Sequence, residues 1–319
     1  MGRRRHKNER PGPPGFLVVD KPAGLTSHDV VDCARKWLGT RRVGHLGTLD
    51  PQATGVLPLA IRAATKLVPF VSDTDKGYIG IVKLGVETDT LDAEGSVLRR
   101  HEGDFPDEPT VLEALEAFRG DISQIPPMYS AVKKDGVPLH KLARKGEEVE
   151  REPKNVTIHR IELMRFVPGE AEGDGPEVEL RVDCSAGTYV RTLASDLGTA
   201  LGCGAHLSSL RRVRSGLFTV PDAISSDQLQ KAADAGEIDN LLVPPEKALA
   251  LPTLRVSPEG ERRLLHGADI ASGTVLRVAP GDRVVALDPQ DRLLAILELR
   301  SDRRLWPLRV LRGENSQEG

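Results

Sequence analysis

Apolar residues recur along this chain with two different spacings, and each spacing predicts a different kind of element. In "EVELRVDC", residues 177–184, every second residue is apolar, which predicts a half-buried strand. "FLVVDKP" is a continuous apolar run that Pro22 ends, which predicts a short buried strand. "GVLPLAI" and "GYIGIVKLGVE" predict two more strands, and Pro58 favours a bulge or an edge position for the first of them.

Apolar residues three and four positions apart predict helices between these strands. One helix is predicted to begin at Ser27 as its N-cap and to end at Gly39. Its inward face would carry Val30, Val31, Ala34, Trp37 and Leu38. Thr110 and Glu113 form a capping-box pattern for a second helix. The inward residues of that helix would be Val111, Leu112, Leu115 and Phe118.

The strand at 177–184 runs through the turn "SAG" into a third helical pattern, "TYVRTLASDLGTAL". Its first turn, with Tyr189 and Arg191, would therefore lie beside a strand end, where sites are commonly built. "SSDQLQKAADAGEI" predicts a further helix, and from about residue 250 short apolar runs and turns predict a small β-rich module. Strands and helices mix without βαβ regularity, so the sequence favours an α+β fold.

Composition and charge narrow the kind of protein. With 39% hydrophobic residues in 319, the chain can bury a sizeable core. Its net charge of −3 hides an uneven distribution, with basic runs such as "ARKWLGTRR" and "LRRVR" and acidic runs such as "HEGDFPDE". A basic face is one interpretation, and ordinary solvated surface is the other. Three cysteines without C-x-x-C spacing fit a reducing cytoplasm better than a disulfide scaffold or a zinc site.

Several common functional motifs are absent from the sequence. It has no P-loop, no G-x-G-x-x-G, no H-E-x-x-H and no H-x-E with paired cysteines. These absences count against nucleotide hydrolysis, redox chemistry and zinc-dependent deamination. "TDTLDAEG" lacks the acid spacing of an EF-hand loop. The start of the chain lacks the apolar run of a signal peptide, and no stretch approaches the roughly 18 apolar residues of a membrane span. We therefore expect a soluble cytoplasmic protein.

One carboxylate stands alone in the glycine-rich stretch "RRVGHLGTLDPQATGVLPL". Because Asp-Pro commonly starts a turn, Asp50 can be read as a structural residue. With arginines in reach, its charge would be stabilised and it could act as a nucleophile or base. The chain has only three tyrosines, Tyr78, Tyr129 and Tyr189, too few for a stacking platform but suited to the capture of one extruded base. The alternative is that each tyrosine fills the edge of a core.

Together with the Asp50 stretch, other segments carry a family resemblance. "VVDKPAGLTSHDVV", "DKGYIGIVKLGVETDTLDAEG", "PPMYSAVKKDGVPLHKLARKGEEV", "VDCSAGTYVRTLASDLG" and "LRRVRSG" occur in one order. With "GHLGTLDPQATGVLPL" they resemble the blocks of the bacterial tRNA pseudouridine-55 synthases, over roughly residues 15–225. The last 60 or so residues resemble, more loosely, a small RNA-binding module of the PUA kind. His140 departs from the pattern, because relatives more often have a tyrosine there.

The resemblance implies an α+β catalytic domain with a mixed, mostly antiparallel sheet and an RNA-binding insertion in its first half. The domains expected from it are a disordered basic tail at 1–14, a catalytic domain at 15–249, a PUA-like domain at 250–312 and a tail at 313–319. The implied reaction breaks the glycosidic bond of a tRNA uridine, rotates the base and joins C5 to the ribose. It uses no metal and no cofactor.

The resemblance also implies roles for individual residues. Asp50 would be the essential carboxylate, and Arg191 would orient it through an ion pair. Tyr78 would stack on the flipped uracil and share in the proton transfer at C5. Leu210 and Tyr189 would line the same pocket.

Other residues are implied to contact the RNA or to support the catalytic loop. His45 would fill the gap left by flipped T-loop bases, and Lys21 with Pro22 would brace the loop. The basic runs would contact T-arm phosphates, which position an RNA without reading its sequence. The remaining residues of the implied RNA-binding set are Gly47, Thr48, Arg211 and Arg212.

We therefore expect a monomer that isomerises the T-loop uridine of tRNA without a guide RNA or a protein partner. A guide-RNA-dependent pseudouridine synthase is the alternative within the same chemistry. A non-catalytic chaperone that folds tRNA is the alternative from another class, and a folding role could also accompany catalysis.

Overall fold

A computed structural model gives the structure of the protein. It describes residues 9–72, 74–130, 133–134, 136–143, 146, 149–171, 173–272 and 277–311. Residues 1–8 and 313–319, from the two predicted tails, lie outside this part of the chain.

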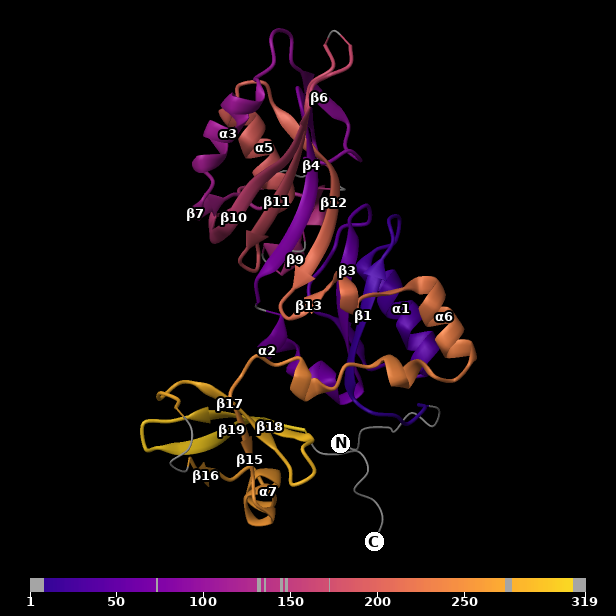
Figure 1. Cartoon of the computed structure of the whole chain (residues 1–319), viewed down its shortest axis with the longest axis vertical. Helices are drawn as coiled ribbons and strands as arrows, with labels where there is room; N and C mark the ends of the chain where they lie inside the picture. Colours follow the sequence, from indigo (N-terminus) through magenta and orange to yellow (C-terminus); the bar gives the residue numbers. More distant parts are fainter. Residues whose placement is uncertain are drawn as a thin grey trace.

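Ten strands form one long mixed sheet, whose main path runs β14–β1–β3–β12–β4–β11–β10–β7 (Figure 1). Two further strands pair beside this path, β2 with β3 and β13 with β12. Of the pairs in the described part of this sheet, β14–β1 and β3–β12 are parallel and the others are antiparallel. The strands are β1 Gly15–Lys21, β2 Val43–His45, β3 Thr54–Ile61, β4 Lys76–Leu84, β7 Gly120–Gln124, β10 Lys154–Val167, β11 Glu177–Cys184, β12 Ala205–Ser215, β13 Phe218–Thr219 and β14 Ile224–Ser225.

Helices cover the face of this sheet that holds its larger core. In Figure 1, α3 and α5 lie against the end with β10 and β11, and α1 and α6 lie beside β1. Apolar residues from both ends join one buried cluster, which includes Leu17 of β1 and Val182 of β11. The helices are α1 Ser27–Leu38, α2 Val68–Val71, α3 Glu108–Glu116, α4 Leu139–Ala143, α5 Val190–Ala200, α6 Ser226–Asp234 and α7 Pro258–Leu265. The 3-10 helices are η1 Arg62–Leu67, η2 Val220–Asp222, η3 Ile238–Leu241 and η4 Pro245–Lys247.

The C-terminal residues form a separate five-stranded sheet in the order β15–β17–β18–β19–β16, at the lower end of Figure 1. Its strands are β15 Thr253–Arg255, β16 Ile270–Ala271, β17 Arg283–Leu287, β18 Leu293–Leu299 and β19 Arg304–Val310. This unit has a core of its own and shares a second core with the long sheet. In the shared core Phe16 and Val18 of β1 belong to the same buried cluster as Val285 and Ile296.

Two short hairpins complete the described part of the chain. They are β5 Val86–Thr88 with β6 Val97–Arg100, and β8 Lys133–Lys134 with β9 Val137–Pro138. No helix in the described ranges is long and apolar enough to cross a membrane.

The main predictions from the sequence are confirmed. The fold is α+β, with a mixed, mostly antiparallel sheet and a small β-rich C-terminal unit. The alternation at 177–184 buries Val178, Leu180, Val182 and Cys184, as predicted for β11. The helix after Ser27 ends at Gly39, which adopts the left-handed conformation (φ 60°) that favours glycine. The domain boundary between residues 249 and 250 stays a prediction.

Two predictions about helix starts are wrong. The N-cap of α1 is Thr26, whose side chain forms a capping box with Asp29, and Ser27 is the first helical residue. The N-cap of α3 is Asp107, which accepts a bond from the backbone N–H of Thr110. The inward face of α3 is also narrower than predicted. Leu112, predicted to face inward, is 46% exposed.

Two further expectations need correction. Pro58 lies neither at an edge nor at a bulge, because β3 has neighbours on both sides and pairs with β1 without a register shift. Proline has no N–H to donate, and this is tolerated because Pro58 lies just beyond the residues of β3 that pair with β2. The Pro58 carbonyl accepts a bond from the Leu46 N–H. Residues 9–14 were expected in a disordered tail, but they are bound to the fold. Arg10 donates to the Gly39 carbonyl, and Arg62 donates to that of Pro13.

Candidate active site

Asp50 lies in the loop between β2 and β3, and hydrogen bonds fix this loop on both sides of it. The Ser27 hydroxyl donates to the Leu49 carbonyl (3.0 Å) and accepts from the Leu49 N–H (2.8 Å). On the other side, the Lys21 ammonium and the Gly24 N–H both donate to the Pro51 carbonyl, each at 2.9 Å. The start of α1 and the end of β1 therefore set the position of the carboxylate.

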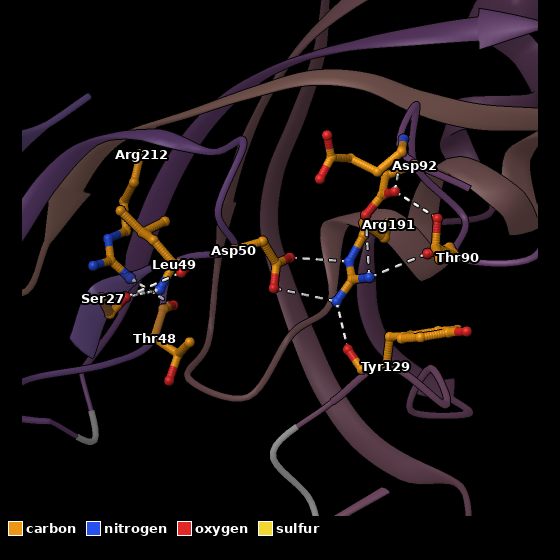
Figure 2. A network of polar contacts seen from close by, with 10 residues as sticks. Ser27, Thr48, Leu49, Asp50, Thr90, Asp92, Tyr129, Arg191 and Arg212 are labelled. Atoms are coloured by element: carbon orange, nitrogen blue, oxygen red, sulfur yellow. Dashed lines mark hydrogen bonds and ion pairs between the residues drawn. The ribbon is translucent and has the colours of Figure 1, made fainter. Parts of the chain in front are cut away.

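Arg191, in the first turn of α5, forms an ion pair with Asp50 (Figure 2). Its Nε lies 3.0 Å from Oδ2 of Asp50, and its Nη2 lies 3.3 Å from Oδ1. The same guanidinium donates to the carbonyls of Tyr129 (2.8 Å) and Thr90 (3.1 Å) and to the carboxylate of Asp92 (3.2 Å). Five contacts thus orient the guanidinium, and two of them orient Asp50.

The electrostatic balance at Asp50 has opposing contributions. Burial raises the pKa of Asp50 and the charge of Asp92 adds to this effect, while Arg191 and Lys21 oppose it. The Asp50 side chain still keeps 40% of its surface exposed. The guanidinium 3.0 Å away favours the carboxylate form against the effect of burial. The site thus presents an oriented carboxyl group to whatever enters it.

A cavity of about 350 Å³ opens beside this ion pair. Its lining combines charged groups such as Asp50, Asp92 and Arg191 with the apolar side chains of Leu207 and Leu210. The residues that line it are Asp50, Gln52, Ala53, Asp92, Ala93, Glu94, Arg191, Leu207, Ser208, Ser209 and Leu210. This volume lies in the range of small-ligand sites, which combine apolar walls with a few oriented polar groups. Such a cavity can hold one planar ring against Leu210 with Asp50 at its edge.

The two tyrosines predicted for the site lie around this cavity but do not line it. Tyr78 of β4 is buried at 9% exposure, in register with Arg212 of β12. Burial raises the pKa of Tyr78, and the charge of Arg212 acts in the opposite direction. Tyr189 directly precedes α5, where Gln124 accepts from its backbone N–H at 3.1 Å. Burial raises the pKa of Tyr189 as well.

Lys21 and Pro22 occupy positions that fit a bracing role. Lys21 is fully buried, and its ammonium donates to the carbonyls of Pro22 and Pro51, both at 2.9 Å. The pKa of Lys21 is lowered to about 8, mainly by burial, and the negative charge of Asp50 acts in the opposite direction. The lysine therefore binds the residue that directly follows the carboxylate.

The loop residues that were predicted to bind RNA, His45, Gly47 and Thr48, precede Asp50 in the chain. Nδ1 of His45 accepts a bond from the Gly47 N–H at 3.4 Å, and burial lowers the pKa of this imidazole. Thr48 is exposed, while its carbonyl faces inward toward Arg212. Contact of these three residues with RNA stays a prediction.

The expectation that Arg212 contacts phosphates is wrong, because its side chain is inside the protein. Arg212 is 1% exposed, and its guanidinium donates to three backbone carbonyls. Arg211 lies on the opposite face of β12 and forms a two-pronged ion pair with Asp20 (3.0 and 2.9 Å). Side chains alternate along a strand, so Arg211 points away from the face that carries Leu210 and Arg212. Any RNA contact of Arg211 would be on the side away from Asp50.

Asp92 and Thr90 are part of the site although the sequence did not single them out. Both belong to "TDTLDAEG", which was considered only as a calcium loop and as a block of the family. The Thr90 hydroxyl donates to Oδ1 of Asp92 at 2.5 Å, while Oδ2 faces Arg191. No spacing in the sequence relates this loop to Asp50; in the fold Arg191 of α5 contacts both, and Gln52 donates to Glu94 at 2.6 Å. The side chain of His140 lies outside the described residues.

Comparison with family models identifies most of the chain. A model described as TruB family pseudouridylate synthase (N terminal domain) matches residues 35–190. A second model, described as tRNA pseudouridylate synthase B C-terminal domain, matches residues 191–250, ahead of the expected module at 250–312.

Individual proteins support this match. The tRNA pseudouridine synthase B of Pseudomonas paraeruginosa is 43% identical over 305 residues, which are 93% of this chain and 96% of that protein. The protein of the same name from Geobacter sulfurreducens is 45% identical over 289 residues, covering 86% and 92%.

Solved structures show the same fold. A Cbf5–Nop10–Gar1 complex contains a chain with a TM-score of 0.70 and 29% identity, covering 93% of this chain and 83% of that one. An H/ACA RNP bound to a substrate RNA contains one with a TM-score of 0.69 and 27% identity, covering 94% and 86%. Family models, near-full-length relatives and fold agree that this chain belongs to the TruB family of pseudouridylate synthases, which are isomerases.

Proposed function

We propose that this enzyme converts the uridine at position 55, in the T loop of tRNA, to pseudouridine, without a guide RNA, a protein partner or a cofactor. Its near-full-length relatives are named tRNA pseudouridine synthase B, at 43% and 45% identity. The chains from guide-RNA complexes are more distant, at 29% and 27%. Similarity therefore favours the tRNA enzyme over the guided one.

The observation that carries the proposal is Asp50, oriented by Arg191 at one side of a cavity that can hold a single base. The reaction breaks the N1–C1′ bond of uridine and forms a C5–C1′ bond, while C5 loses a proton and N1 gains one. Substrate and product are isomers, so the balance needs no oxidant, reductant or second substrate. It needs an oriented carboxylate and a cavity that retains the detached base while it turns.

A uridine in a folded T loop must leave its stack to reach this cavity. Extrusion of a base costs a few kcal/mol, which contacts in the pocket must offset. Leu207 and Leu210 provide an apolar surface for the ring, and the polar lining residues provide partners for its edge. In this proposal Tyr78 and Tyr189 act beside the pocket, and His45, Gly47 and Thr48 meet the RNA at the loop before Asp50. The PUA-like unit at 250–312 would add contacts to the T arm.

The test measures tritium release from an unmodified tRNA transcript that carries 5-tritiated uridine, with purified protein and no added metal or nucleotide. Wild-type protein should release close to one equivalent per tRNA, from the T-loop uridine alone. Asp50→Asn should abolish release, because an amide is neither a nucleophile nor a base of useful strength. Its tRNA affinity should stay within about tenfold, roughly 1.4 kcal/mol, because the contacts to the RNA remain.

The matched control is Asp32→Asn, an exposed carboxylate of α1 that pairs with Arg35 in its own helix. It should keep wild-type activity. An Asp50→Asn variant that retains most of its rate would remove Asp50 from the mechanism. Tight tRNA binding without any release by the wild-type protein would contradict catalysis and favour a chaperone or a guided complex.

A further inference from the structure

Arg212 is a buried cation in an unusual environment. Its side chain is 1% exposed, and its guanidinium donates to the carbonyls of Val56 (2.7 Å), Gly47 (3.2 Å) and Thr48 (3.4 Å). Among the described residues, no carboxylate lies within ion-pair distance of it. Burying a charge is costly unless hydrogen bonds replace its water. Here three neutral backbone carbonyls take the place of that water, and they fix the orientation of the guanidinium.

The partners of Arg212 come from two different parts of the catalytic apparatus. Gly47 and Thr48 belong to the loop that leads directly to Asp50 (Figure 2). Tyr78 lies in register with Arg212 on the neighbouring strand, so the charge of the guanidinium acts on its phenol. One rigid planar group therefore binds the backbone before the carboxylate and lies beside the tyrosine of the site.

The backbone of the fold is built to bring Arg212 this close. Gly55, at the start of β3, adopts φ +100° and pairs with Arg212 in the parallel contact between β3 and β12. A Cβ atom at Gly55 would lie 2.2 Å from the Arg212 carbonyl oxygen. Only glycine permits this approach, which places the guanidinium beneath the catalytic loop.

We propose that Arg212 is a positioning residue of the reaction, which fixes the Gly47–Thr48 backbone before Asp50 and holds a positive charge beside Tyr78. This inference deepens, and rests on, the proposed isomerisation of a tRNA uridine. The nearby positive charge favours the phenolate, which opposes the effect of burial and suits Tyr78 to proton transfer.

Kinetics of three variants separate positioning from ordinary structural support. Arg212→Met removes the charge and all three donors. Arg212→Lys keeps a charge but lacks the planar fork of three donor nitrogens. The control is Arg62→Met, because Arg62 is also buried (2% exposed) and donates to the carbonyls of Pro13 and Leu38, away from the site, although it also pairs with Asp239 at 2.8 Å. Single-turnover release and tRNA affinity are measured for each variant, at a temperature where melting curves show that it is folded.

We expect Arg212→Met to lower the single-turnover rate by about 10²-fold, the effect of a misplacement of roughly 1 Å at reacting groups. Its tRNA affinity should stay within about threefold, because Arg212 does not reach the surface. Arg212→Lys should recover part of the rate. Arg62→Met should lower the melting temperature and leave the rate per folded molecule unchanged.

A spectroscopic measurement tests the contact with Tyr78 without using activity. The chain has three tyrosines, so [13Cζ]tyrosine labelling gives few enough resonances to assign with a Tyr78→Phe variant. This carbon reports hydrogen bonding and charge at the phenol oxygen. Its resonance for Tyr78 should shift in Arg212→Met and keep its position in Arg62→Met.

The outcomes are distinct. Rates of the two Arg212 variants close to that of Arg62→Met, or an unchanged Tyr78 resonance in Arg212→Met, would overturn the proposal. If Arg212→Met does not fold, Arg212→Lys decides by the same two measurements, because it loses the fork in any case. Absence of release by wild-type protein would contradict the proposed function alone, and the resonance would still show whether Arg212 acts on Tyr78.

Discussion

At the scale of single residues, Arg191 is shared by two carboxylates with different tasks. Asp50 faces the cavity and receives two contacts from the guanidinium. Asp92 receives one and is itself fixed by the Thr90 hydroxyl. Asp92 therefore holds the arginine in the orientation that serves Asp50, and its negative charge also acts on Asp50 directly.

Two substitutions at Asp92 separate these effects. Asp92→Ala leaves Nη1 of Arg191 with the Thr90 carbonyl as its remaining partner, so we expect a rate loss of about 10- to 100-fold, or roughly 1.4–2.8 kcal/mol. Asp92→Asn keeps an acceptor and should lose less. Because the charge of Asp92 raises the pKa of Asp50, its removal should lower that pKa.

Single-turnover rates across pH check this prediction. The rate should fall on the acid side as Asp50 takes up a proton, and in Asp92→Asn this fall should move to lower pH. An acid limb that stays in place, or moves to higher pH, would show that the charge of Asp92 does not act on the reacting carboxylate.

The sequence could point to a site residue only where the signal lies in its neighbours along the chain. Asp50 stands alone in a loop that two arginines precede, so both its chemistry and its family block pointed to it. Arg212 was misjudged because a run of basic residues does not show which side chain turns inward. Asp92 was missed because its link to Asp50 passes through a helix almost 100 residues later, a relation that only the folded chain creates.

At the scale of elements, β12 explains how neighbouring arginines come to differ. Along this strand Leu210 and Arg212 face the side of the catalytic loop, and Arg211 faces the other side with Asp20. Strand alternation is readable from a sequence when apolar and polar residues alternate, as they do in β11. In "LRRVR" both faces carry charge, so the pattern gives no register.

The helix starts show a similar limit. Thr26 and Ser27 are adjacent hydroxyl residues, and either could cap α1 by type. Thr26 has Asp29 three positions later and completes a capping box, which leaves the Ser27 hydroxyl to bind Leu49. The start of α1 thus depends on the reciprocal bonds between Thr26 and Asp29, and the Ser27 hydroxyl supports the loop of the site.

Gly55 links the element scale to stability. Its φ of +100° and the 2.2 Å that a Cβ would leave to the Arg212 carbonyl mean that Gly55→Ala must displace β3 or β12. We expect a loss of more than about 3 kcal/mol in the free energy of unfolding, from backbone strain and steric overlap together. Gly44→Ala in β2 is the control, since no atom lies within 4 Å of its Cβ position. Urea unfolding of both variants gives the answer, and equal stabilities would contradict the close approach.

At the scale of the whole molecule, the two sheets are joined by a core to which both contribute. Phe16, Val18 and Val56 of the long sheet belong to one buried cluster with Val285 and Ile296 of the C-terminal sheet. The guanidinium of Arg283 also lies 5.3 Å from the ring centre of Phe70, which belongs to α2. The C-terminal unit thus covers the face of β1 and β3 opposite the larger core, and it supports the strands next to the Asp50 loop.

A shared core predicts that the two sheets unfold together. Scanning calorimetry should show one transition for the wild-type protein, although chains of two domains often unfold in separate steps. Ile296→Ala, in the shared core, should destabilise this single transition by about 2–5 kcal/mol. Leu305→Ala, in the core that belongs to the C-terminal sheet alone, should shift the same transition, since unfolding of one sheet exposes the apolar face of the other. Two separate transitions, with Leu305→Ala moving only one of them, would mean that the shared core is too weak to couple the sheets. The catalytic loop would then owe its stability to the long sheet alone.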